Sequence, residues 1–177
     1  MSLGVMRQIA LALLLPACAW AEPLQFQDND RIAFVGNTVI ERAPRFGHLE
    51  SMVSVAVGPE VSGLVFRNFG WSGDSVFGDA RAYFGKPQEG RERLQKVIAE
   101  FKPTVLFVCY GTNAAMTSDR GWTDDAAGAK RSQGGDEEGR KLFVEQYGKL
   151  LGLMSEASGD GLRKTILLAP PPLENLD

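Results

Sequence analysis

The sequence is short of the residue types on which metal centres, dinucleotide sites and nucleic-acid surfaces depend. It has one histidine and two cysteines, and its His, Cys, Asp and Glu residues are not grouped at metal-ligand spacing. Acidic residues outnumber basic ones by 22 to 19, which gives a formal net charge of −3 and no basic footprint for a phosphate backbone. The glycines after the first predicted strand do not follow the G-x-G-x-x-G pattern. We therefore expect no metal, no cofactor and no nucleic-acid partner.

Long hydrophobic runs are also missing. The apolar run at residues 9–15 has seven members, whereas a membrane-spanning helix needs roughly 20. Arg7 precedes this run and the triplet Ala-Trp-Ala follows it at residues 19–21, which is the pattern of a secretory signal peptide. We expect residues 1–21 to be removed and the mature protein, starting at Glu22, to be secreted or periplasmic.

A lipoprotein signal is the alternative for the same segment. Residues 15–18, Leu-Pro-Ala-Cys, resemble a bacterial lipobox, in which Cys18 would carry a membrane anchor. If residues 1–21 are removed, Cys109 is the only cysteine left, so no internal disulfide can form. Cys109 stands inside an apolar segment, where a lone cysteine is typical of a packed core.

What the sequence does have is a regular alternation of apolar segments. With 44% hydrophobic residues the chain can bury a core, and residues 22–177 are expected to form one domain. Short apolar segments predict strands, and segments with apolar residues at i, i+3, i+4 and i+7 predict helices between them. The strands are expected at 32–35, 64–66, 104–110 and 165–169, and the helices around 49–56, 94–101 and 143–154.

This alternation predicts an α/β fold. Right-handed crossovers between parallel strands would give a three-layer α/β/α sandwich, a flavodoxin-like, doubly wound, mostly parallel sheet in the order 2-1-3-4. The first and third strands are neighbours in that order, so the switch point lies between Thr38 and Asn113. Polar turns at 37–38, 70–73 and 111–113 would meet at this crevice, and residues 114–135 are expected to form a long loop.

These turns carry a family resemblance. Residues 34–39, Phe-Val-Gly-Asn-Thr-Val, resemble the first block of the SGNH (GDSL-type) hydrolases, where a strand ends in Gly-Asp-Ser and the serine is the nucleophile. Residues 68–75, Asn-Phe-Gly-Trp-Ser-Gly-Asp-Ser, resemble the second block, whose glycine lends an N–H to the oxyanion hole. Residues 111–113, Gly-Thr-Asn, are similar to the third block, whose asparagine donates to the same oxyanion. The resemblance spans roughly residues 31–172 and implies hydrolysis of a small-molecule or carbohydrate ester, such as a carbohydrate acetyl ester.

Residue by residue, the resemblance places Thr38 at the nucleophile position, after Asn37, and Gly70 and Asn113 at the oxyanion donors. Attack of an alcohol on an ester carbonyl produces a tetrahedral oxyanion, and preorganised donors are worth roughly 3 kcal/mol each in stabilising it. Thr38 has the required alcohol, but that alcohol needs a base. The alternative is that Asn37 and Thr38 only cap the helix that follows.

Two departures from the family pattern bear on activity. Thr38 and Asn37 stand where the family has serine and aspartate, and the Asp-x-x-His that supplies the family's general base is not found before Asp177. The single histidine, His48, is expected to be a partly buried structural residue of the first helix. We therefore expect the domain to be incomplete at its C-terminus and this chain to be a weak or inactive esterase. A non-catalytic carbohydrate- or ligand-binding module that keeps the crevice is the alternative.

Three further residues have competing interpretations. Ser75 belongs to a literal Gly-Asp-Ser tripeptide, yet it lies five residues beyond Gly70 and away from the strand-to-helix turn, which disfavours it as the nucleophile. Trp71 and Trp122 are predicted in loops near the crevice, where they would either stack on an apolar or sugar face of the substrate or pack internally.

Overall fold

The computed structural model describes residues 24–113 and 137–171, and these residues build a four-stranded parallel sheet in the order β2-β1-β3-β4. The predicted strand order is therefore confirmed. The predicted signal peptide, with Cys18, and the expected loop with Trp122 lie outside the described residues. The strands are β1 (Arg31–Gly36), β2 (Val65–Gly70), β3 (Val105–Cys109) and β4 (Lys164–Leu167).

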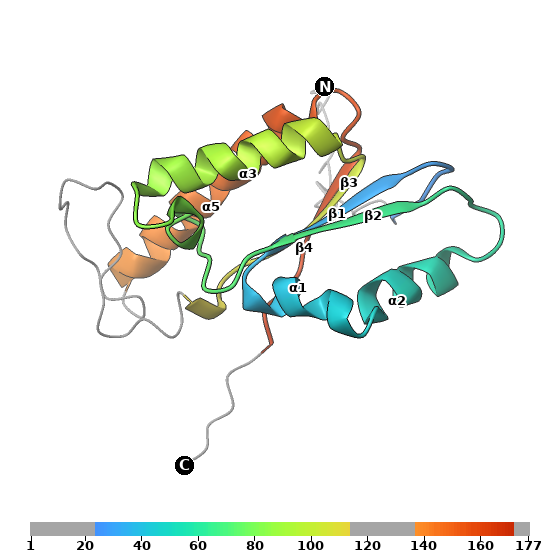
Figure 1. The fold of residues 1–177 in the computed structure, drawn as a ribbon, viewed down its shortest axis with the longest axis horizontal. Helices are drawn as coiled ribbons and strands as arrows, with labels where there is room; N and C mark the ends of the chain where they lie inside the picture. The colour runs from blue at the N-terminus through green and yellow to red at the C-terminus, as the bar shows by residue number, and fades with distance from the viewer. Residues whose placement is uncertain (1–23, 114–136, 172–177) are drawn as a thin grey trace, which may run out of the picture.

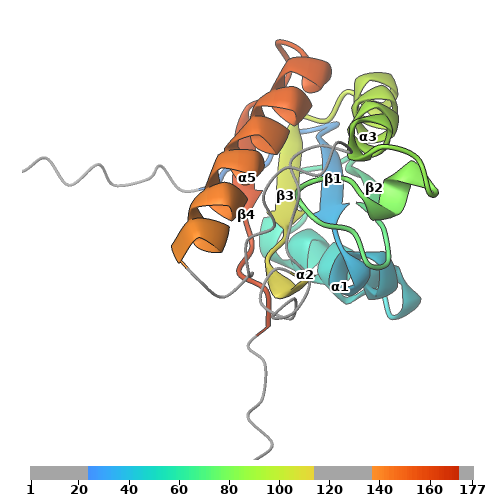
Figure 2. The ribbon, with the colours of Figure 1, turned by 90° about the vertical axis from the view of Figure 1, so that its left-hand side faces the viewer.

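Helices cover both faces of the sheet, which confirms the three-layer α/β/α arrangement (Figure 1). Two long helices, α3 and α5, lie on one face, and the shorter α1 and α2 lie on the other, as the turned view also shows (Figure 2). The helices are α1 (Thr38–Arg42), α2 (His48–Val57), α3 (Pro87–Phe101) and α5 (Glu137–Ser158), with short 3₁₀ helices η1 (Ala43–Arg45) and η2 (Ala80–Ala82).

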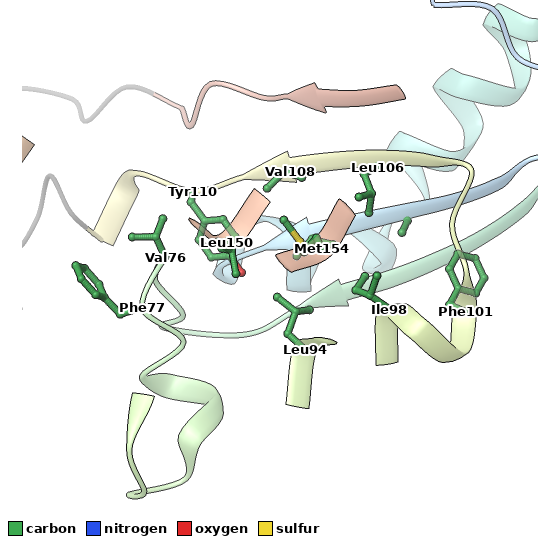
Figure 3. Packing of buried hydrophobic residues seen from close by; sticks show 12 residues of the cluster. Val76, Phe77, Leu94, Ile98, Phe101, Leu106, Val108, Tyr110, Leu150 and Met154 are labelled. Atoms are coloured by element: carbon green, nitrogen blue, oxygen red, sulfur yellow. The ribbon is translucent and has the colours of Figure 1, made fainter. Parts of the chain in front are cut away.

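The central strand β1 divides the apolar core into two halves. Its successive side chains point to opposite faces, so Ala33 and Val35 pack toward α3 and α5, while Ile32 and Phe34 pack toward α1 and α2. Cys109 at the end of β3 is buried in the second half, as predicted for a core residue. Figure 3 shows the first half, which also contains Val76, Phe77, Leu94, Ile98, Phe101, Leu106, Val108, Tyr110, Leu150 and Met154.

Helix α2 differs from its prediction in the face that it buries. Leu49 and Val53 pack against the core, whereas Met52 is 67% exposed and Ala56 is also exposed. The face that packs on the core is thus only this i, i+4 pair, and both of its side chains are partly buried. His48, the first residue of α2, is exposed and stacks on Phe46 with ring centroids 5.6 Å apart, so the expectation that it is partly buried was wrong.

A buried carboxylate holds together the ends of the sheet farthest from the polar turns. Asp30, 2% exposed, accepts hydrogen bonds from Thr104 Oγ1 at 2.6 Å and from Arg163 at 2.5 Å. These residues precede β1, β3 and β4. Burial by itself would raise the pKa of Asp30, but the hydrogen bonds from Arg163, Thr104 and the Gln27 N–H together lower that pKa below its ordinary value.

We predict that Asp30→Asn lowers the free energy of unfolding by about 2 kcal/mol at pH 7, the usual scale for hydrogen bonds to a charged group. Because the folded-state pKa is lowered, this stabilisation is present above the unfolded-state pKa of about 4 and is lost as the pH falls through the folded-state pKa. Urea unfolding between pH 2 and pH 7 measures the difference. Asp160→Asn, which removes an exposed carboxylate, is the control; an equal effect of both variants would contradict the prediction.

Candidate active site

The candidate site begins where β1 passes into α1. Asn37 has an extended backbone and its side-chain oxygen accepts a hydrogen bond from the Val39 N–H at 3.1 Å. It is 1% exposed. These are the properties of an N-cap residue, so Asn37 caps α1. Thr38 is the first residue of the helix, and its half-buried side chain lies at the carboxyl end of the parallel sheet.

The loop that follows β2 brings a backbone donor to Thr38. The Gly73 N–H donates to Thr38 Oγ1 at 3.0 Å. Asn113, which follows β3, points its amide nitrogen at the same loop, 2.6 Å from the Gly73 carbonyl oxygen and 3.0 Å from that of Asp74. Thr38, Gly73 and Asn113 come from three different strand ends, and the structure places them around one point, as the predicted strand order requires.

Gly70 has a different role from the one expected of it. Its N–H donates to Asn68 Oδ1 at 2.8 Å, which corrects the expectation that this group points at an oxyanion. Strand β2 continues to Gly70, whereas we expected it to end at Phe66, so Gly70 belongs to the strand and the loop begins one residue later. A Cβ atom at Gly70 would lie 2.2 Å from the Glu41 backbone nitrogen, so the glycine allows β2 to approach α1.

Sequence reasoning therefore missed Gly73. The available signal was its position in Ser-Gly-Asp-Ser at residues 72–75, where a φ of 71° is natural for glycine and the chain must turn sharply. Ser75, in the same tripeptide, is buried; its hydroxyl donates to Asp79 Oδ1 at 2.5 Å and accepts from the Phe77 N–H. These contacts describe a loop-stabilising serine.

A charged pocket borders Thr38. Glu41, Arg42, Arg45 and Ser72 line it, and the Ser72 hydroxyl donates to the Glu41 carboxylate. Arg42 lies about one helical turn beyond Thr38, and Ser72 immediately precedes Gly73. The pocket is therefore lined by hydrogen-bonding side chains of residues that lie close to Thr38 and Gly73 in the sequence.

Trp71 is half-buried and packs inside the loop. Its ring meets Tyr83 edge-on with centroids 5.3 Å apart, and the Arg81 guanidinium lies 5.7 Å from the ring centroid. The packing interpretation therefore describes the contacts that Trp71 makes in the structure.

A buried ion pair lies directly behind Gly73. Asp74, 1% exposed, accepts from Arg81 Nε at 2.6 Å and from the Tyr110 hydroxyl at 2.8 Å, all on its Oδ2 atom. Burial raises the pKa of Asp74, an effect that Arg81 and Tyr110 oppose. Burial also raises the pKa of Tyr110 well above its ordinary value, so its hydroxyl keeps its proton and donates throughout the neutral range.

No general base contacts Thr38 within the described ranges. Thr38 Oγ1 accepts from Gly73, and neither a carboxylate nor an imidazole hydrogen-bonds to it in residues 24–113 and 137–171. In the same part of the chain there is no group of three metal-ligating side chains, and no helix combines the length and apolar character that crossing a bilayer requires.

The fold is similar to that of solved esterase structures. Two catalytic mutants of Axe2, an acetylxylan esterase from Geobacillus stearothermophilus, match with a TM-score of 0.50 at 17% and 16% sequence identity, over 81% of this chain and 61% of each Axe2 chain. A GDSL-like lipase from Bacteroides thetaiotaomicron matches with a TM-score of 0.39 at 17% identity, over 78% of this chain and 48% of the lipase. Neither a protein-family model nor a curated protein matches the sequence.

The chain thus has an α/β fold with a parallel sheet that is similar to the fold of the Axe2 structures. It spans less than two thirds of the length of the Axe2 chains that it matches, because each match covers 61% of the Axe2 chain.

We predict that Asn68→Ala lowers the free energy of unfolding by about 1 to 3 kcal/mol. The Asn68 amide donates to the Ile40 carbonyl at 2.7 Å and accepts from Gly70, so its loss leaves both backbone groups without this partner and loosens α1 from β2. Urea unfolding measures the change. Lys96→Ala, at an exposed position of α3, is expected to change stability by less than about 0.5 kcal/mol, and a similar value for Asn68→Ala would contradict the prediction.

Proposed function

We propose that the chain carries the active site of a secreted SGNH/GDSL-like hydrolase that acts on ester bonds, with Thr38 at the nucleophile position. The contact between the Gly73 N–H and Thr38 Oγ1, at 3.0 Å, supports this most directly. An oxyanion formed by attack of Thr38 on an ester carbonyl would lie next to the attacking oxygen, within reach of the same N–H. In this proposal Gly73 takes the donor role that the sequence suggested for Gly70.

Asn113 is the second proposed oxyanion donor. Its side-chain nitrogen carries two N–H groups, and it lies within hydrogen-bond distance of the Gly73 and Asp74 carbonyl oxygens. We propose that one N–H turns to the oxyanion as negative charge develops, because a charged acceptor forms a stronger hydrogen bond than a neutral carbonyl. Asn37 then acts only through the helix cap that positions Thr38.

Weak turnover is part of the proposal. A threonine alcohol is almost wholly protonated at neutral pH, and a positioned general base typically contributes about 10²- to 10⁴-fold to such a reaction. Gly73 and Asn113 stabilise the charge on the substrate but cannot take the proton from Thr38. The described residues therefore support an oxyanion site more strongly than they support a complete catalytic apparatus.

The lining of the charged pocket favours a polar substrate. Ser72, Glu41 and the two arginines offer hydrogen-bond donors and acceptors next to Thr38, which suits the hydroxyl groups of a carbohydrate better than a long acyl chain. We therefore propose a carbohydrate carrying a short acyl ester, such as an acetyl group, as the substrate class. Trp71, which is half-buried, and Trp122, which lies outside the described residues, remain proposed sugar contacts.

A binding module is the second candidate function. The observation that favours it is that Thr38 Oγ1 has no acidic or imidazole partner among the residues described. Such a module would bind an acetylated sugar in the same crevice and release it unchanged. Saturable binding of a xylose tetraacetate probe, with no acetate released over a day, would favour this function over hydrolysis.

We predict that the wild-type chain hydrolyses 4-nitrophenyl acetate only slowly and that Thr38→Ala reduces its rate to that of buffer alone. Thr38→Ser, which keeps the alcohol and removes the crowding methyl group, is expected to match or exceed the wild type. Release of 4-nitrophenolate measures all three rates. If Thr38→Ala retains the wild-type rate, the nucleophile lies elsewhere.

Ser75→Ala is the matched control for this experiment. It removes a hydroxyl from the neighbouring loop, and we expect the rate to stay at the wild-type value because Ser75 bonds to Asp79 and Phe77. Loss of the rate in a folded Ser75→Ala variant would instead make the Gly-Asp-Ser tripeptide the catalytic one.

We further predict that the protein recovered from a secreting host begins at Glu22. Intact-mass measurement tests this, since cleavage after Ala21 removes residues 1–21 without adding a group. A mass that corresponds to a lipid-modified Cys18 would show that the lipoprotein alternative is correct.

A further inference from the structure

A buried ion pair between Asp74 and Arg81 lies next to Gly73, the proposed oxyanion donor. Asp74 and Arg81 are 1% and 6% exposed, and Asp74 Oδ2 lies 2.6 Å from Arg81 Nε. Tyr110, which donates to the same oxygen, lies among the apolar side chains at the end of β3 (Figure 3). Neither charge belongs to the proposed reaction, so the pair needs a separate explanation.

Stability alone explains this pair poorly. Removing two charges from water costs several kcal/mol per ion, and replacing a buried pair with apolar residues of similar volume is often neutral or stabilising. Asp74 Oδ1 is buried with no hydrogen-bond partner among residues 24–113 and 137–171, which adds to the cost. Because burying the Asp74–Arg81 pair costs free energy, we ask whether the pair fixes the conformation of the backbone around it.

The contacts of Asp74 show which geometry it holds. Its backbone N–H closes the turn by donating to the Trp71 carbonyl at 3.0 Å, and its own carbonyl accepts from Asn113. Its carboxylate is tied to β3 through Tyr110 and to β2 through Arg81, whose Nη2 donates to the Phe69 carbonyl at 2.5 Å. Gly73 is thus followed directly by a residue whose backbone and side chain are both held by hydrogen bonds.

We propose that Asp74, through Arg81 and Tyr110, is a positioning residue that keeps the Gly73 N–H directed at Thr38 Oγ1, in the site proposed above for ester hydrolysis. Glycine has no side chain to restrict its own peptide plane, so the orientation of this N–H depends on its neighbours. Without the carboxylate, Gly73 would sample other orientations, and the donor would no longer be preorganised for an oxyanion.

The test uses the exchange of the Gly73 amide hydrogen with water, measured by NMR on the intact chain. Tyr110→Phe removes only the hydroxyl that bonds to Asp74, and Asp74→Asn removes the charge at nearly constant size. We expect each to accelerate exchange at Gly73 about tenfold or more, because each loses a hydrogen bond to a charged group. Thr38→Ala removes the acceptor of the Gly73 N–H. Its exchange rate therefore gives the upper limit for the acceleration that loss of this hydrogen bond can cause.

Two controls separate positioning from loss of fold. Lys96→Ala, at an exposed position of α3 outside this loop, does not touch the ion pair and should leave Gly73 exchange at the wild-type rate. Amides of β1, such as that of Val35, should stay protected in every variant, since an unfolding effect would accelerate them together with Gly73. If Asp74→Asn does not fold, Tyr110→Phe alone decides the result.

Unchanged Gly73 exchange in a folded Tyr110→Phe variant would overturn the proposal. The exchange readout needs no turnover, so it separates this inference from the proposed function. Suppose that Tyr110→Phe accelerates Gly73 exchange but the wild-type chain hydrolyses no ester. The positioning role would then be supported, and only the proposed hydrolase function would be contradicted. Where turnover is measurable, Tyr110→Phe should lower kcat and leave KM nearly unchanged, because the oxyanion exists only after the substrate is bound.

Discussion

The site depends on how closely the ends of β1, β2 and β3 approach each other and α1. A Cβ atom at Gly36 would lie 2.4 Å from the Cys109 carbonyl oxygen, and one at Gly70 would lie 2.2 Å from the Glu41 nitrogen. Gly36 pairs with both Gly70 and Cys109 in the sheet register. These close contacts pack α1 against the strand ends. They thereby bring Thr38, its first residue, into contact with the loop that follows β2.

Two kinds of packing meet at this edge. Behind it, the sheet is held by apolar side chains that bury surface without preference for direction. At the edge itself, the chain is held by directed bonds: the Asn37 cap, the Asn68 amide and the Asp74 ion pair each fix one backbone group at a defined angle. The need for directed hydrogen bonds explains why polar side chains such as Asn37 and Asp74 are buried beside the crevice.

The sequence was a good guide to the sheet and a poorer one to the site. Strand order followed from local periodicity and from the handedness of crossovers, both of which are encoded in short segments. The sequence suggested Gly70 as an oxyanion donor, but β2 runs on to Gly70 and its N–H donates to Asn68, because strand pairing with β1 sets the length of β2. The burial of His48 was predicted wrongly for a similar reason, since tertiary packing decides which residues of α2 meet the core. The Asp74–Arg81–Tyr110 cluster joins residues up to 36 positions apart and leaves no pattern along the chain.

The Asp30 cluster lies at the opposite end of the strands and anchors the starts of β1, β3 and β4 to one another. Hydrogen bonds to the Asp30 carboxylate fix the register at this end of the sheet. The alignment of the strands therefore does not depend on the loops at the crevice end. Loops at the crevice are therefore free to change length and composition without shifting the sheet. Such a separation lets the strands keep their alignment while the residues around the crevice vary.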